Sequence, residues 1–179
     1  MSQSEGCAVR SGHSGGMLLK AFDELCRRLR DECLRVYGSN LTSLVVFGSV
    51  GRRTPTHQSD IDILLVAKEL PHGRMSRIRQ FQEVEKRMSE DLLEVKDLGI
   101  HTRLSPLFRT ESEMELGGLI FLDMVEDSKI LVDRGGFFER YIASLREKLV
   151  SMGAVRVRRG STWHWVLKPD LKPGEVFDI

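Results

Sequence analysis

Two aspartates, Asp60 and Asp62, stand two residues apart at the start of the apolar run that ends at Val66. In an extended chain, residues i and i+2 point to the same face, so the two carboxylates lie side by side. Adjacent carboxylates repel each other unless a positive charge stands between them. A hard divalent cation meets that need, because Mg²⁺ takes one or two protein carboxylates and leaves other positions to substrate phosphates. The pair therefore predicts a Mg²⁺ or Mn²⁺ site.

A second group of residues, just upstream, has the types that bind phosphate. Gly48 and Ser49 directly follow the short apolar run 44–47. A glycine lets a phosphate approach the backbone, free N–H groups at the start of a helix or turn bind anions, and a serine hydroxyl donates to a phosphate oxygen. Arg52 lies one turn further along. The loop thus has phosphate donors at one end and metal-binding acids at the other, which suits metal-assisted attack on a nucleoside triphosphate.

Gly48-Ser49, Arg52 and the segment Ser59-Asp60-Ile61-Asp62 resemble, in type and spacing, the signature of the DNA polymerase beta-like nucleotidyltransferase superfamily. The chain is most similar to kanamycin nucleotidyltransferase and to the small stand-alone prokaryotic members, the minimal nucleotidyltransferases. The resemblance implies that Asp60 and Asp62 are catalytic and hold two divalent ions. It implies that Gly48 and Ser49 hold the β- and γ-phosphates, and it assigns Arg52 and Ser59 to nucleotide binding. A hydroxyl acceptor would then attack the α-phosphate and release pyrophosphate.

The chain departs from the family pattern at two places. The family has a third acid on the next strand, but the predicted strand 99–108 contains no Asp or Glu, and His101, Arg103 and Ser105 occupy one of its faces. Asp97, which shares their parity just before the strand, is the nearest candidate. A Gly also often follows the family's arginine, and here that position is Arg53.

The elements that must position these residues follow from hydrophobic periodicity and turn signals. Helices are predicted over 17–37, 75–88, 110–126 and 138–152, strands over 44–47, 61–66, 99–108 and 129–132, and a β-hairpin over 155–167. This order predicts an α/β (α+β) fold, and the resemblance implies a small mixed sheet flanked by helices, with a C-terminal helix and β-hairpin. The predicted organisation is a flexible leader (1–16), a nucleotidyltransferase domain (17–135), and a helix, hairpin and extended tail packed on the same domain (136–179).

Composition excludes several classes of protein. The chain has 179 residues and a formal net charge of +1, so a global field attracting nucleic acid or acidic membranes is absent. No apolar run approaches the roughly 20 residues of a membrane span, so no membrane partner is expected. Cys7, Cys26 and Cys33 show no metal-ligand spacing, and the latter two fall on the apolar face of a predicted helix. This cysteine usage predicts a reducing, cytoplasmic location.

Three functions remain open at this stage. The first is a metal-dependent nucleotidyltransferase that uses an NTP, with ATP chosen only for its abundance, and a small molecule or protein side chain favoured over RNA as acceptor. The second is an antitoxin-like binding module that neutralises a small helical, toxin-like partner protein. The third is an RNA-binding protein with a vestigial nucleotide site, because residues 146–172 hold seven Lys and Arg against two acids. There Trp163-His164-Trp165 either covers the domain or forms a stacking platform.

Overall fold

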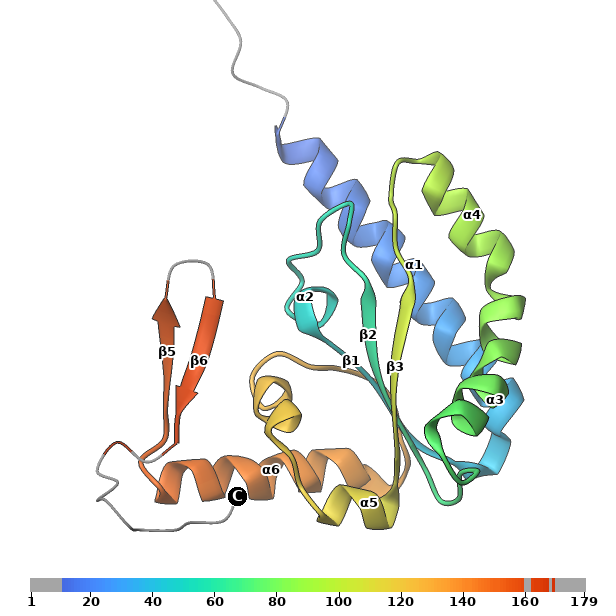
Figure 1. The fold of residues 1–179 in the computed structure, drawn as a ribbon. Helices are drawn as coiled ribbons and strands as arrows, with labels where there is room; N and C mark the ends of the chain where they lie inside the picture. Colours follow the sequence, from blue (N-terminus) through green and yellow to red (C-terminus); the bar gives the residue numbers. More distant parts are fainter. Residues whose placement is uncertain (1–10, 160–161, 168, 170–179) are drawn as a thin grey trace, which may run out of the picture.

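The computed structural model describes residues 11–159, 162–167 and 169, and these form a mixed sheet with helices on both faces and a separate hairpin (Figure 1). The elements follow the order α1 (Ser11–Tyr37), η1 (Gly38–Asn40), β1 (Leu41–Phe47), α2 (Gly48–Gly51), β2 (Ile61–Ala67), α3 (Arg74–Arg87), α4 (Ser89–Asp97), β3 (Leu104–Thr110), α5 (Glu111–Glu115), η2 (Leu119–Met124), β4 (Lys129–Asp133), η3 (Arg134–Gly136), α6 (Phe137–Ser151), β5 (Val155–Arg159) and β6 (Thr162–Val166).

The main sheet has the strand order β3-β2-β1-β4. β1 is antiparallel to both β2 and β4, whereas β2 and β3 are parallel. The end of β1 therefore lies beside the starts of β2 and β3. The predicted α/β architecture with a small mixed sheet is confirmed, and the edge of the sheet that collects these three strand ends is the one that carries the candidate residues.

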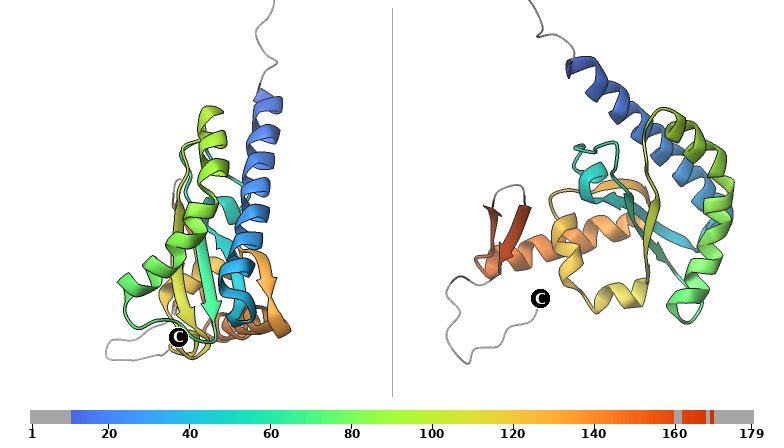
Figure 2. Two further views of the ribbon diagram at one scale, coloured as in Figure 1. Left: turned by 90° about the vertical axis from the view of Figure 1, so that its right-hand side faces the viewer. Right: turned by 45° about the horizontal axis from the view of Figure 1, so that its top comes forward.

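Each face of the sheet has its own apolar core. Ile61, Ile63 and Leu65 of β2 pack with residues of α1, α3 and α4, while Leu64 and Val66 pack with residues of η2 and α6. The alternation follows from the two-residue repeat of a strand. Asp62 has the parity of Leu64 and Val66 and therefore lies on the face of the sheet that η2 and α6 cover. Figure 2 shows the helices of the two cores from the side.

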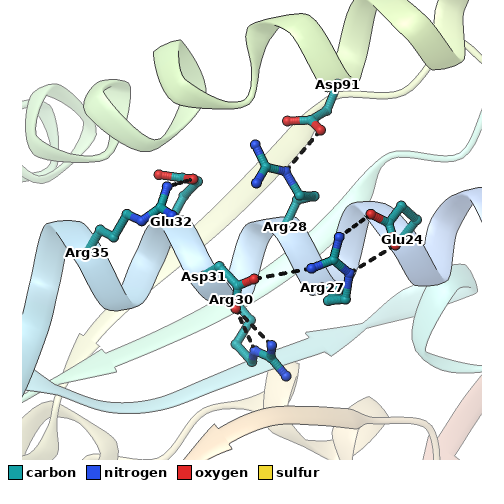
Figure 3. A network of polar contacts seen from close by, with 8 residues as sticks. All are labelled: Glu24, Arg27, Arg28, Arg30, Asp31, Glu32, Arg35 and Asp91. Atoms are coloured by element: carbon teal, nitrogen blue, oxygen red, sulfur yellow. Dashed lines mark hydrogen bonds and ion pairs between the residues drawn. The ribbon is translucent and has the colours of Figure 1, made fainter.

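Charged side chains link the outer surface of α1 to α4 (Figure 3). Arg28 Nε donates to Asp91 Oδ1 over 3.0 Å, joining the middle of α1 to the first turn of α4. The other pairs of the network lie along α1 itself, such as Arg27 with Glu24 and Arg35 with Glu32. Pairs within one exposed helix contribute little to stability, so the contact between the two helices is the one that matters for the fold.

Several predicted boundaries were wrong. α1 begins at Ser11, so residues 11–16 of the predicted leader are helical, while the rest of that leader lies outside the described residues. The helix predicted from Thr110 to Glu126 ends at Glu115, because Gly117 and Gly118 both have positive φ angles, and a 3-10 helix follows. A helix, α4, stands between the predicted helix 75–88 and β3, where no helix was predicted.

Other local predictions are confirmed. Thr110 and Glu113 form the predicted capping box at the start of α5. Gly153, with φ +67°, ends α6 as a left-handed C-terminal cap. β5 and β6 form the predicted hairpin, although the side chain of Trp163 lies outside the described residues. Cys26 and Cys33 are buried free thiols. Within the described part of the chain, the helices are all too short or too polar to cross a bilayer.

Candidate active site

Gly48 and Asp62 meet where β1 ends and β2 begins. The antiparallel register pairs Phe47 with Asp62, which brings the next residue, Gly48, against the Asp62 side chain. Gly48 has φ +66°, a left-handed conformation that favours glycine. A Cβ at position 48 would overlap Asp62 Oδ2 and lie 3.3 Å from its Cγ. Only glycine fits between the turn and the carboxylate without displacing it.

The loop 52–60 is folded back onto this turn by serine hydroxyls. Ser49 Oγ donates to Ser59 Oγ over 3.0 Å, and Ser59 Oγ also accepts from the backbone N–H of Thr56 over 2.9 Å. The N–H of Thr54 donates to the Ser49 carbonyl over 2.9 Å. These bonds place the hydroxyls of Ser49 and Ser59 together, although ten residues separate them in the chain.

Arg52 extends from this loop toward Asp127, in the segment between η2 and β4. Its Nη1 lies 3.9 Å from Asp127 Oδ2, and Arg156 of β5 contacts the same oxygen at 2.5 Å. A Cβ at Gly51 would lie 2.5 Å from the Asp127 carbonyl oxygen, so the turn is packed tightly on this segment. Asp127 therefore connects the C-terminal hairpin to the loop that carries Arg52.

The Asp62 carboxyl lies in a mixed environment that raises its pKa. Burial is the main cause, and the negative charge of Asp60 adds to it, while a hydrogen bond with Ser105 and the charge of Arg52 act in the opposite direction. Ser105 is the register partner of Asp62 on the parallel strand β3. Because the ionised form is disfavoured without a compensating cation, the pair of carboxylates is poised for one.

Asp60 faces the other neighbouring strand end. Its Oδ1 accepts from the backbone N–H of Arg103 over 3.2 Å, and its Oδ2 lies 3.4 Å from Arg103 Nη2. The Arg103 side chain is 86% exposed and therefore free to swing away in solvent. The two acids thus have different neighbours, with Gly48 and Ser105 beside Asp62 and Arg103 beside Asp60.

Asp97, the nearest candidate for a third carboxylate, does not stand just before the strand as expected. Asp97 is an exposed residue at the C-terminal end of α4, and the strand that follows starts only at Leu104. The side chain that stands next to Asp62 on that strand is Ser105. In the described part of the chain, His, Cys, Asp and Glu do not gather in groups of three or more that could hold a metal ion.

A divalent cation fits the residues that are present, because both side chains are hard oxygen donors and the charge of Asp60 lies close enough to Asp62 to raise its pKa, in addition to the larger effect of burial. Sequence reasoning singled out Gly48, Ser49, Ser59 and both acids, and the structure brings these together. It did not assign roles to Arg103, Ser105 or Asp127. The alternating pattern of β3 was the available signal for Ser105, whereas no local pattern indicates Asp127.

A family model and a known protein each match more than half of this chain. The family model described as nucleotidyltransferase domain matches residues 26–132. A Methanocaldococcus jannaschii protein named as a candidate protein adenylyltransferase is 25% identical over 150 residues, which cover 82% of this chain and 93% of that protein.

Two solved structures are also similar. One is a candidate nucleotidyltransferase from Sulfolobus solfataricus, which is 19% identical to this chain. The alignment covers 71% of this chain and 94% of that protein, with a TM-score of 0.41. The other is a chain of a toxin–antitoxin structure with AMP-PNP, which is 17% identical to this chain. The alignment covers 69% of this chain and 92% of that chain, with the same TM-score of 0.41.

Proposed function

From the premise that this chain belongs to the nucleotidyltransferase domain family and is a nucleotidyltransferase, we propose that it transfers AMP from ATP to a hydroxyl group of a protein. The observation that carries the proposal is the contact between Gly48 and Asp62. It joins a turn that admits phosphate to a carboxylate that needs a cation. If Gly48 only formed a turn and Asp62 only began a strand, the two residues would not need to be in contact.

The roles of the site residues follow from their positions. Gly48 and the hydroxyls of Ser49 and Ser59 receive the β- and γ-phosphates, and Arg52 adds positive charge beside them. Asp60 and Asp62 would hold Mg²⁺ or Mn²⁺ as hard oxygen ligands. When bound, such an ion would stabilise the negative charge that develops during phosphoryl transfer.

The covalent step forms a bond between the acceptor oxygen and the α-phosphorus. The bond from the α-phosphorus to the oxygen that bridges it to the β-phosphorus breaks, and pyrophosphate leaves with that electron pair. The acceptor proton passes to solvent, which reaches this edge of the sheet because the Asp60 side chain is 37% exposed. The protein contributes mainly alignment of the two oxygens and electrostatic stabilisation.

The choice of a protein acceptor rests on the Methanocaldococcus relative, whose name describes adenylyl transfer to protein and which matches over nearly its whole length. ATP as donor follows from the same name. Because the proposed reaction consumes ATP, we propose that the protein works in the cytoplasm.

Calorimetric titration with each NTP, with and without Mg²⁺, tests the nucleotide site. We expect saturable binding of ATP that requires Mg²⁺, and loss of that binding in Asp62→Asn. Asp123→Asn, which alters an exposed carboxylate in η2, is the matched control and should bind like the wild type. Binding that ignores both Mg²⁺ and Asp62, or no binding by the folded protein, would overturn the proposal.

A further inference from the structure

A cavity of about 700 Å³ has Asp60 in its lining. Its walls are α4, the C-terminal part of α3 and the segment 100–103 that leads into β3. Asp60 and Arg103 form one end of it, whereas Gly48 and Ser49 do not line it. The volume lies in the range of sites that enclose a small molecule or a few side chains.

The cavity lies at the same edge of the sheet as the acids, on the face that α3 and α4 cover, whereas Asp62 lies on the opposite face. β2, which carries both acids, lies between β1, which leads into Gly48, and β3, which Arg103 precedes. In phosphoryl transfer the attacking and leaving oxygens lie roughly in line on opposite sides of the phosphorus. If pyrophosphate leaves over Gly48, beyond β1, the attacking oxygen arrives from the β3 side, and a group held in the cavity would reach it around the start of β2, where Asp60 lines the cavity.

Apolar residues and charged residues of both signs line the cavity. Leu92, Leu93 and Ile100 provide apolar surface, and Leu93 is 58% exposed at the edge. Glu85 and Lys96 contribute one charge of each sign, and Asp60 is paired with Arg103. A nucleic-acid backbone requires an excess of positive charge, which this lining lacks.

The walls of the cavity are held in place by contacts outside it. Arg28 of α1 binds Asp91 in the first turn of α4 (Figure 3). At the other end of α4, the N–H of Ile100 donates to the Val95 carbonyl over 3.0 Å, and the N–H of His101 donates to the His57 carbonyl over 2.7 Å. The cavity is therefore a fixed feature between α4 and the loop that precedes Asp60.

We propose that this cavity receives an apolar side chain of the protein acceptor, which thereby presents its neighbouring hydroxyl to the α-phosphate beside Asp60. The inference rests on the proposed function and adds to it the chemistry by which the acceptor is recognised. Burying an apolar side chain contributes affinity, and the short distance from that side chain to an adjacent hydroxyl confines the hydroxyl to the catalytic edge of the sheet.

Blocked dipeptides and one small alcohol test the inference directly. N-acetyl-Leu-Ser-amide, N-acetyl-Lys-Ser-amide and 2-phenylethanol are titrated into protein with methyl-labelled Leu and Ile, in the presence of Mg²⁺ and a non-hydrolysable ATP analogue. The same compounds are then offered with Mg²⁺ and ATP, and adenylyl transfer is measured by mass spectrometry. We expect the Leu-Ser compound to shift the methyl signals of Leu92, Leu93 and Ile100 and to accept AMP.

A matched pair of variants separates the cavity from the nucleotide site. Leu93→Glu places a charge at the cavity edge, and Leu98→Glu makes the same change at a residue that is 67% exposed at the end of α4 and outside the lining. We expect Leu93→Glu to lower kcat/KM for the Leu-Ser compound about tenfold, which corresponds to about 1.4 kcal/mol. Affinity for Mg²⁺ and ATP should be unchanged in both variants, and Leu98→Glu should transfer AMP like the wild type.

Several outcomes would overturn the inference. The cavity does not recognise the acceptor if the Lys-Ser compound accepts AMP as well as the Leu-Ser compound does, or if kcat/KM is unchanged in Leu93→Glu. The same conclusion follows if the methyl signals shift but no AMP is transferred. Transfer to 2-phenylethanol as efficient as to the Leu-Ser compound would show that the cavity serves a small apolar alcohol rather than a protein. Intact nucleotide binding with no methyl shifts would contradict the role of the cavity and leave the proposed function standing. A folded protein that binds no nucleotide would contradict the proposed function, and with it the role of the cavity in that reaction, even if the methyl signals shift.

Discussion

Gly48 and Asp62 occupy one shared space at the edge of the sheet, since a side chain at residue 48 would overlap the Asp62 carboxylate. The contact arises because β1 turns sharply at a left-handed glycine while its antiparallel partner β2 begins directly opposite. The turn and the acid are therefore one structural unit. A change in either residue is expected to alter the nucleotide site before it alters the fold.

Gly48→Ala tests this unit. The substitution forces alanine into a left-handed conformation, which costs roughly 1–2 kcal/mol, and it displaces the Asp62 side chain, which can rotate away. Gly153→Ala is the matched control, because Gly153 has nearly the same φ of +67° and open space around it. We expect similar losses of stability by chemical denaturation, but at least about a tenfold loss of affinity for Mg²⁺ and ATP in Gly48→Ala alone. Equal affinity in both variants would show that the contact is incidental.

Asp62→Asn should stabilise the metal-free protein. Burial raises the pKa of Asp62 above its usual 3.8, so the folded protein holds this proton more tightly than the unfolded chain. Stability therefore falls as pH rises through the folded pKa, and at pH 7 the ionised side chain is a cost that asparagine removes. We expect a higher free energy of unfolding than that of the wild type at pH 7, and no gain below pH 3.8.

Thermal unfolding of both proteins across pH 3 to 8, without divalent ions, measures this effect. The wild type should gain more than Asp62→Asn when Mg²⁺ and ATP are added, because a ligand that binds only the folded state stabilises it. A variant less stable than the wild type at neutral pH without metal would show that Asp62 is a structural residue.

Ser105→Asp should add a third carboxylate beside Asp62. Ser105 is the register partner of Asp62 on β3 and lies within hydrogen-bond reach of it. With two carboxylates we expect one Mn²⁺ bound per protein in the presence of a non-hydrolysable ATP analogue, and with three we expect two. Electron paramagnetic resonance of free Mn²⁺ counts the bound ions. The metal-free variant should also be less stable, because a third negative charge adds repulsion.

Ser112→Asp, an exposed change in α5, serves as the control and should bind as many ions as the wild type. If the wild type already binds two ions with the analogue, then neither Arg103 nor Ser105 prevents binding of the second ion. The argument that the second ion needs a third carboxylate would then be wrong.

The candidate residues could be found from the sequence because they lie within one short segment. Gly48 and Ser49 follow one clearly apolar strand, Asp60 and Asp62 stand at the start of the next, and the two-residue repeat of a strand puts both acids on one face. Their neighbours could not be found in the same way. The contact of Asp62 with Ser105 depends on the parallel register of β2 and β3, which is set by packing between segments more than 40 residues apart.

Helix α4 was missed for a physical reason that also explains the cavity. Val95 is its one buried residue, while Leu93 is exposed, so the segment has no continuous apolar face with helical periodicity. A helix that buried Leu93 fully would have been easier to predict, but its packing would have filled the space beside Asp60.

Arg53→Gly should stabilise the protein relative to Arg53→Ala. Arg53 has φ +61°, the one positive φ among the non-glycine residues that the structure describes, and its guanidinium lies 3.5 Å from Asp23 at the surface. Both variants lose this weak ion pair, but only glycine relieves the left-handed strain. We expect glycine to exceed alanine by about 0.5–1 kcal/mol, because strain of about 1–2 kcal/mol is partly offset by the larger backbone entropy of glycine. Equal unfolding free energies from urea titration would contradict this account.

Glu113→Gln should destabilise the protein in a pH-dependent way. Both Glu113 oxygens accept from Arg77, each over 2.7 Å, and this pairing, helped by the Thr110 N–H, lowers the pKa of Glu113 to about 2 from its usual 4.5. A lowered pKa contributes stability that is present above the unfolded value and lost as pH falls toward the folded one. We expect a loss of roughly 1–2 kcal/mol at pH 7, discounted for solvent screening, that shrinks to nothing as pH falls from 4.5 toward about 2. Urea titrations of Glu113→Gln beside Glu115→Gln, an exposed change in the same helix, measure it. A difference from the wild type that persists unchanged at the acid end would mean that the carboxylate acts by packing rather than by charge.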